Sequence, residues 1–112
     1  MIECLVMGDS IAVGIGQHSP QCKTVAKVGI TSKNWYLNHK EFITNNNFKK
    51  VVISLGSNDS WHITSESLYN IRSKIKADKV VWILTSAVLK PTQRVIIKEI
   101  ANEFKDITVD IS

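Results

Sequence analysis

The sequence predicts a three-layer α/β/α domain, in which helices cover both faces of a five-stranded parallel sheet. Short apolar runs alternate with helix-type segments along the whole chain. The clearest runs, residues 51–55 and 80–84, are almost continuously apolar, which is typical of strands buried on both faces. A chain of 112 residues is long enough for one compact domain and too short for two. We therefore expect one minimal domain over residues 1–112.

Five segments have the length and composition of strands. The first begins at Ile2, and the second is only modestly apolar but contains β-branched residues. The third has Ser54 as its one polar residue, and the last lies at the end of the sequence. The predicted strands are residues 2–7, 23–28, 51–55, 80–84 and 107–111.

The first two predicted helices follow the first two strands. Residues 11–17 form a short helix-like segment that contains Gly14 and Gly16. Thr31 or Ser32 can cap a second helix that runs to about residue 44. Three consecutive asparagines, residues 45–47, then end it, because asparagine prefers turns and caps.

The remaining two helices separate the last three strands. Thr64 or Ser65 can cap a helix running to Ala77, with apolar side chains recurring at helical spacing. Pro91 suits the first turn of the last helix, which extends to Phe104. Right-handed crossovers between these elements favour the flavodoxin-like strand order 2-1-3-4-5.

Polar turns leave the strands on either side of the expected switch in winding direction. Gly8-Asp9-Ser10 follows the first strand, and Gly56-Ser57-Asn58-Asp59 follows the third. Residues 28–31, after the second strand, are expected beside them. Ligands of such sheets bind at the carboxyl ends of the strands, so these turns are the predicted site.

The net charge of +4 comes from lysines that are scattered along the chain. No basic run is interleaved with aromatic residues, so we expect no nucleic-acid partner. The apolar runs are far below the ~20 residues needed to cross a bilayer, and we expect no membrane partner. Because no basic leader precedes the first strand, the sequence predicts a cytoplasmic location.

Two cysteines and three histidines are the residues to consider as thiolate or imidazole ligands of a metal. Cys4 and Cys22 are expected in strands as buried thiols, reduced in the cytoplasm although a disulfide is geometrically possible between neighbouring strands. His18, His39 and His62 show no metal-ligand spacing with either cysteine. We therefore expect no metal site and no cofactor.

Together the turns resemble the signature blocks of the SGNH (GDSL-type) hydrolases. Met7-Gly8-Asp9-Ser10-Ile11-Ala12-Val13-Gly14 is similar to the first block, Gly29 matches the second-block glycine, and Gly56-Ser57-Asn58-Asp59 is similar to the third. The resemblance implies an esterase-like hydrolase acting on an O-acylated carbohydrate, a lipid or a small ester. It makes Ser10 the nucleophile and gives the oxyanion hole to the N–H groups of Ser10 and Gly29 and to the Asn58 amide.

Elementary chemistry agrees with these assignments. Ser10 stands at a helix start, where unpaired N–H groups and the helix dipole favour a developing negative charge. Glycine at position 29 lets a substrate approach the backbone, and the Asn58 amide donates without losing a proton. Each residue also has a simpler interpretation: Asp9-Ser10 as a helix cap, Gly29 as a turn glycine, and Asn58-Asp59 as an Asx turn.

The general base is the part of the family pattern that the sequence does not supply in its usual place. The family carries Asp-x-x-His after its last strand, followed by a helix, whereas this sequence ends at Ser112 on the last strand. His62, four residues beyond Asn58, is a candidate for a relocated base, and a neighbouring chain is another source. A third reading is a catalytically impaired binding or assembly module. Without that helix, we expect one sheet face to expose apolar surface, and our hypothesis is that a homodimer or a protein partner covers it.

Overall fold

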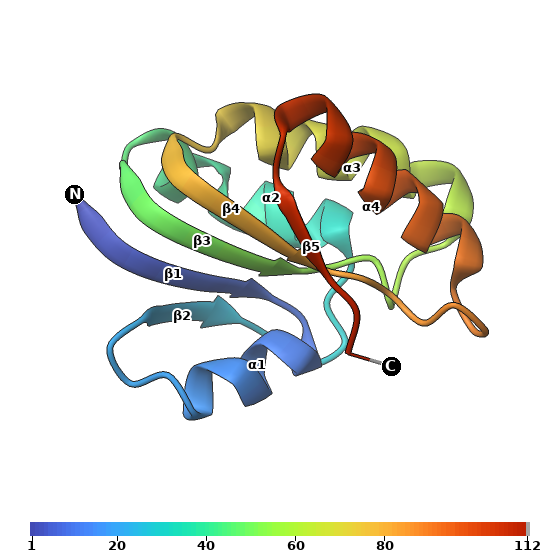
Figure 1. Cartoon of the computed structure of the whole chain (residues 1–112), viewed down its shortest axis with the longest axis horizontal. Coiled ribbons are helices and arrows are strands. Elements are labelled where there is room, and N and C mark those ends of the chain that lie inside the picture. Colours follow the sequence, from blue (N-terminus) through green and yellow to red (C-terminus); the bar gives the residue numbers. More distant parts are fainter. Residues whose placement is uncertain (112) are drawn as a thin grey trace.

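The computed structural model describes residues 1–111, and for residues 61–63 it describes the backbone alone. Strands and helices alternate from end to end, and the parallel sheet has the order β2-β1-β3-β4-β5 (Figure 1). Both the predicted fold class and the predicted strand order are confirmed. The elements are β1 (Ile2–Gly8), α1 (Ser10–Gln17), β2 (Lys23–Ala26), α2 (Ser32–Thr44), β3 (Phe48–Ser54), α3 (Trp61–Lys74), β4 (Ala77–Ile83), α4 (Pro91–Phe104) and β5 (Ile107–Val109).

The two faces of the sheet carry very different amounts of helix. Helices α2, α3 and α4 lie together on one face, and α1 lies on the other, next to β1 and β2 (Figure 1). The main hydrophobic core fills the space between the sheet and the three helices, with Trp35 and Trp82 among its fully buried side chains. Within the described residues, no helix is long and apolar enough to span a bilayer.

Helix α3 begins and ends earlier than the sequence predicts. The sequence predicts Thr64 or Ser65 as the cap, but Thr64 lies inside the first turn, where its single hydroxyl proton is within reach of the Asp59 carboxylate at 3.0 Å and the Ser60 carbonyl at 3.1 Å. At the other end Ala77 begins β4, because Ile75 is already extended and Lys76 accepts a backbone hydrogen bond from Phe48. Tertiary contacts therefore decide both boundaries.

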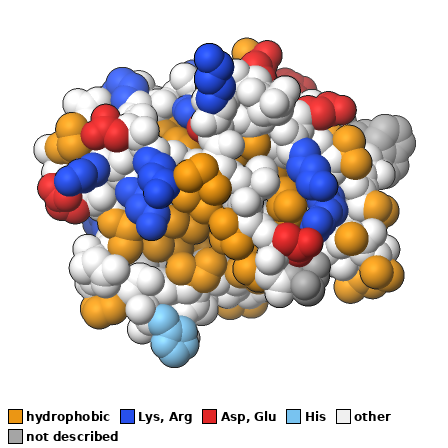
Figure 2. All heavy atoms as spheres, in the orientation of Figure 1, with side chains coloured by type: hydrophobic (Ala, Val, Ile, Leu, Met, Phe, Trp, Pro, Cys, Tyr) orange, Lys and Arg blue, Asp and Glu red, His pale blue; other side chains and the backbone are white. Residues whose placement is uncertain are grey.

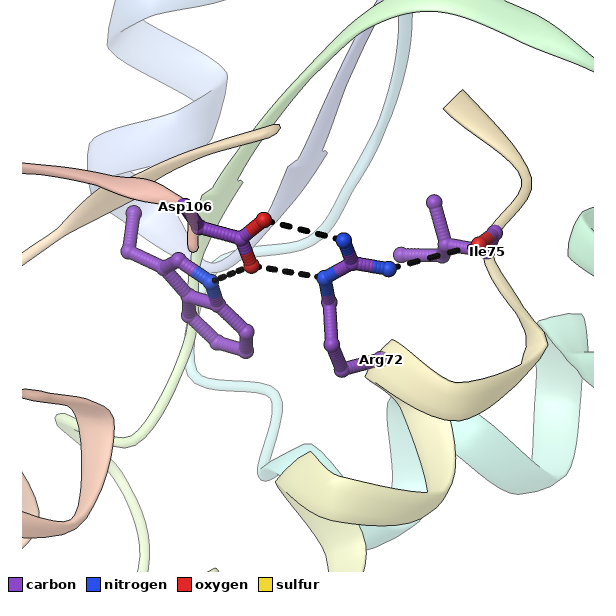
Figure 3. A network of polar contacts seen from close by, with 4 residues as sticks. Arg72, Ile75 and Asp106 are labelled. Carbon is purple, nitrogen blue, oxygen red and sulfur yellow. Dashed lines mark hydrogen bonds and ion pairs between the residues drawn. The ribbon is translucent and has the colours of Figure 1, made fainter. Parts of the chain in front are cut away.

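A buried ion pair joins α3 to the turn before β5 (Figure 3). The Arg72 guanidinium binds the Asp106 carboxylate through two hydrogen bonds of 2.6 and 2.9 Å, and the Trp82 indole N–H donates to the same carboxylate at 2.9 Å. Arg72 also donates to the Ile75 carbonyl at 3.3 Å and lies over the Phe104 ring. Planar bidentate pairing of this kind fixes geometry as well as charge, so it holds α3, β4 and the end of α4 together.

The prediction of reduced thiols is wrong for this structure. Cys4 in β1 and Cys22, just before β2, form a disulfide with a Cα–Cα distance of 4.6 Å. The two chain segments run side by side in the sheet, which brings the two Cα atoms to a separation that a disulfide can span. The bond closes a loop that contains α1, and it ties the start of the edge strand β2 to its neighbour β1.

The second face of the sheet is left partly uncovered beside β5. Ile107 and Val109 stand in register with Val81 and Ile83, none of which belongs to the core on the three-helix side. Ile107 is 45% exposed and Val109 37% exposed. Figure 2, in the orientation of Figure 1, shows hydrophobic side chains gathered over the middle of this face.

Candidate active site

Backbone hydrogen bonds bring the three polar turns together at the carboxyl ends of the strands. Gly8, the last residue of β1, stands opposite Ala26 of β2 and Ser54 of β3. The Lys27 N–H donates to the Gly8 carbonyl at 3.0 Å, and the Asp9 N–H donates to the Ser54 carbonyl at 2.9 Å. The turns after β1, β2 and β3 therefore start side by side at the carboxyl ends of the strands, as the topology predicts.

Gly8 is required for this close approach. It has φ 137°, and a Cβ at this position would lie 1.8 Å from the Ser54 carbonyl oxygen. Any other residue would therefore collide with the backbone of β3 in addition to adopting a strained φ. The glycine of the Gly8-Asp9-Ser10 turn lets β1 and β3 meet directly beneath the serine.

Asp9 caps α1 and is almost completely buried, with 1% exposure. Its Oδ1 accepts from the Ile11 N–H at 3.1 Å and from the Ser54 hydroxyl at 3.0 Å, whereas its Oδ2 has no hydrogen-bond partner among the described residues. Burial raises the pKa of the Asp9 carboxyl, although the hydrogen bonds from Ser54 and the backbone act to lower it. The capping interpretation therefore applies to Asp9, and the side chain of Ser10 is not needed as a cap.

Ser10 is the first residue of α1 and is exposed. Its side chain is not used for capping, because Asp9 supplies that hydrogen bond. Its N–H belongs to the first turn, where a helix offers no internal acceptor. The hydroxyl and the N–H of Ser10 are thus both available at the edge of the sheet.

Gly29 and Asn58 lie in the two neighbouring turns and are linked through one carbonyl. Gly29 has φ 79° and is exposed, and a Cβ there would meet no atom within 4 Å. The Asn58 side-chain amide donates to the carbonyl of Ile30, the residue after Gly29, at 3.1 Å. An amide nitrogen carries two donors, so this hydrogen bond orients Asn58 and leaves one N–H for another acceptor.

Asp59 is a structural centre of the site that the sequence analysis did not identify. Its carboxylate accepts from the N–H and hydroxyl of Ser32 and from the Thr64 hydroxyl, and Asp59 is buried. The side chains of Gln93 and Lys90 donate to its carbonyl at 2.9 and 3.3 Å. Asp59 thereby connects the loop after β3 with the beginnings of α2, α3 and α4. A buried carboxyl group needs such partners, and its burial is a property of the folded structure that left no signal in the sequence.

The three histidines occupy different surroundings. His62 lies in the first turn of α3, and its side chain lies outside the described residues. His39, on α2, packs against the Trp35 ring in a tilted arrangement with a centroid distance of 4.8 Å, and burial lowers the pKa of His39. His18 is exposed and is the C-cap residue of α1. Among the described residues, no group of three His, Cys, Asp or Glu side chains is arranged to hold a metal ion.

Comparison with solved structures identifies the fold. No protein-family model matches the chain, and no curated protein matches its sequence. An acetyl xylan esterase from Geobacillus stearothermophilus aligns over 97% of this chain and 76% of its own, with 17% identity and a TM-score of 0.67. A GDSL-like lipase from Bacteroides thetaiotaomicron aligns over 96% of this chain and 67% of its own, with 20% identity and a TM-score of 0.73.

A third structure extends the likeness. An α/β hydrolase from the metagenome of Lake Arreo aligns over 99% of this chain and 77% of its own, with 10% identity and a TM-score of 0.72. At these identities the likeness is one of fold. The chain has the SGNH hydrolase fold that the sequence motifs predict, and it spans between two thirds and about three quarters of these structures.

Proposed function

On the premise of an SGNH hydrolase fold, we propose that this protein hydrolyses esters through Ser10. The observation that carries the proposal is the meeting of three turns, held by backbone hydrogen bonds, that present Ser10, Gly29 and Asn58 at one edge of the sheet. The structural neighbours support the reaction class, because two of them are described as an esterase and a lipase.

The reaction has two steps. Ser10 Oγ attacks the acyl carbon of the ester, its proton passes to a base, and the alcohol leaves with a proton as the acyl-serine forms. Water then attacks the acyl-serine, which releases the carboxylic acid and returns the proton to Ser10. In both steps the carbonyl oxygen becomes an oxyanion, and the N–H groups of Ser10 and Gly29 and the free Asn58 N–H would stabilise it.

The reaction needs a base within reach of Ser10, and His62 is our candidate. It follows the loop that carries Asn58 and lies in the first turn of α3. Asp59 and His62 have the Asp-x-x-His spacing of the family motif, yet Asp59 already accepts three hydrogen bonds from Ser32 and Thr64. We therefore propose that Asp59 fixes the loop, and that the imidazole of His62 acts without that carboxylate.

Covalent labelling with a fluorophosphonate tests the proposal. The wild type and His39→Ala should be labelled at Ser10, Ser10→Ala should not, and His62→Ala should be labelled at least ~100-fold more slowly. Hydrolysis of p-nitrophenyl acetate should follow the same order. Absence of label on folded wild type would refute the hydrolase, and undiminished labelling of His62→Ala would show that the base is another residue of this chain or is supplied by another chain.

The uncovered sheet face favours a second function. Ile107, Val109 and Ile111 are exposed apolar residues on and after the edge strand, and apolar surface of this kind marks interfaces. We propose that a second copy of the chain covers this face. If Ser10→Ala leaves the biological activity intact, the domain is a binding or assembly module that keeps the fold of a hydrolase.

The cytoplasmic location remains a prediction, and the disulfide weighs against it. Thiol-reducing systems keep cytosolic cysteines reduced, so a Cys4–Cys22 bond is more stable in an oxidising compartment. Mass spectrometry of the protein, alkylated as it is released from its native cells, would separate the two locations.

A further inference from the structure

A polar cavity lies beside Gly29, between the turn after β2 and the first two turns of α2. Its volume is about 200 Å³, and it is lined by Lys27, Val28, Gly29, Ile30, Asn34 and Asn38. A space of this size is smaller than a typical drug-sized pocket and suits one compact ring. Because Gly29 belongs both to the cavity and to the proposed oxyanion hole, a group held in the cavity would be adjacent to the reacting carbonyl.

The donors and acceptors of the cavity come from one face of α2. Asn34 and Asn38 are four residues apart on the helix, so their side chains project in the same direction. Both are exposed, and in the described part of the chain neither side-chain amide has a hydrogen-bond partner. Two amides, each with a carbonyl and an NH₂ group, match vicinal hydroxyls, which also donate and accept.

Lys27 and the apolar lining complete the chemistry. The Lys27 backbone is fixed by its hydrogen bond to Gly8, and its side chain forms no salt bridge in the described structure. It adds three further donors to the rim. Val28 and Ile30 offer apolar contact of limited extent, far less than an acyl chain would need. This composition matches a sugar ring, with polar edges and apolar faces, better than it matches a lipid.

We propose that this cavity is a subsite for the sugar ring of an O-acylated carbohydrate, with Asn34 and Asn38 as the specificity-determining residues. The proposal rests on the hydrolase function of Ser10 and names the alcohol that the reaction releases. A site built to hydrogen-bond hydroxyls discriminates strongly against an alcohol that lacks them, because its polar groups then lose their partners.

The kinetic test compares two acetyl esters that differ only in the alcohol. For Asn34→Ala/Asn38→Ala, kcat/KM on a mono-O-acetylated methyl xyloside should fall at least ~10-fold, because each lost hydrogen bond costs several-fold. For p-nitrophenyl acetate, which has no sugar hydroxyls, kcat/KM should stay within twofold. Asn70→Ala, an amide on α3 outside the cavity, should change neither value.

Two kinetic results would overturn the subsite. One is an equal loss on both substrates, which would show that the asparagines act on the serine rather than on the alcohol. The other is wild-type preference for p-nitrophenyl octanoate over both acetates, which would assign the site to a lipid ester.

A binding measurement separates failure of the subsite from failure of the hydrolase. Methyl β-xyloside, which carries no ester, should shift the NMR signals of the Asn34 and Asn38 amides and of the Gly29 N–H in Ser10→Ala. Such shifts without turnover by the wild type would retain the subsite and refute the hydrolase. Turnover of p-nitrophenyl acetate without shifts at saturating millimolar sugar would retain the hydrolase and refute the subsite.

Discussion

At the scale of single residues, two glycines near the candidate serine have opposite roles. Gly8 has positive φ and no room for a Cβ, whereas Gly14, inside α1, has no atom within 4 Å of a built Cβ. We expect Gly8→Ala to destabilise the protein by about 3 kcal/mol or more, because both strain and collision oppose it. Gly14→Ala should stabilise it by ~0.5–1 kcal/mol, since alanine favours the helix.

Urea denaturation of the wild type and the two variants measures both effects. Both variants add one methyl group, but only the one at Gly8 meets other atoms, so Gly14→Ala is the control for the added methyl group. A Gly8→Ala protein as stable as the wild type would contradict the close packing of β1 on β3.

Asp9 makes the stability depend on pH. Because burial raises the pKa of its carboxyl, the folded state binds the proton more tightly than the unfolded state. The resulting stabilisation is fully present below the ordinary carboxyl pKa of about 4, and it is lost as pH rises through the raised value. Asp9→Asn keeps the capping oxygen but cannot ionise.

We therefore expect the stability of Asp9→Asn, relative to the wild type, to increase from pH 4 to pH 7. Free energies of unfolding from urea titrations at several pH values measure this difference. Asp78→Asn, at an exposed position on β4, controls for the loss of one carboxylate. Parallel pH profiles for the wild type and Asp9→Asn would contradict the prediction.

At the scale of elements, the disulfide secures the edge strand β2, which has only four residues. The cysteines are 18 residues apart, and closing a loop of about this length stabilises a protein by roughly 3 kcal/mol in the chain-entropy description. We expect reduction to lower the free energy of unfolding by about 2–4 kcal/mol.

Thermal unfolding with and without dithiothreitol provides the measurement. Cys4→Ser/Cys22→Ser should behave like the reduced wild type and should not respond to dithiothreitol. Two titratable thiols in the folded, untreated protein would show that the bond is absent.

The ion pairs of the chain differ greatly in what they do for its elements. Arg72 and Asp106 have side-chain exposures of 11% and 4%, whereas Lys49 and Glu3 have 64% and 77% at a distance of 3.9 Å. Exposed pairs contribute between zero and about 1 kcal/mol. Removing one member of a buried pair leaves the other charge buried without a partner and costs about 3–5 kcal/mol. The Arg72 network therefore fixes the relative positions of α3 and β5.

At the scale of the whole molecule, the uneven distribution of helices leaves the exposed apolar residues of β5 as the proposed contact for a second copy. We expect light scattering after size-exclusion chromatography to show association of the wild type at high concentration. Ile107→Lys/Val109→Lys should be monomeric, because charged side chains at the contact would oppose burial. Leu37→Lys, which removes an even more exposed apolar side chain (53%) on the three-helix face, should associate like the wild type. A strictly monomeric wild type would contradict the proposal.

The sequence by itself determined the alternation of strands and helices, the strand order and the edge of the sheet where the polar turns meet. These features follow from local patterns, namely apolar runs, caps and glycines, combined with the handedness of parallel crossovers. The predicted start of α3 is wrong because Thr64, a residue type that often caps helices, donates its hydroxyl hydrogen bond to Asp59 from inside the helix.

Only the tertiary structure decided which distant residues become partners. The Ser32–Asp59 and Arg72–Asp106 contacts join positions 27 and 34 residues apart, and the disulfide joins Cys4 of β1 to Cys22, the residue before β2. The cavity beside Gly29 likewise requires the turn after β2 to meet one face of α2. Such pairings depend on the distances between elements that pack against one another in the folded protein. Those distances cannot be read from the residue types along the chain.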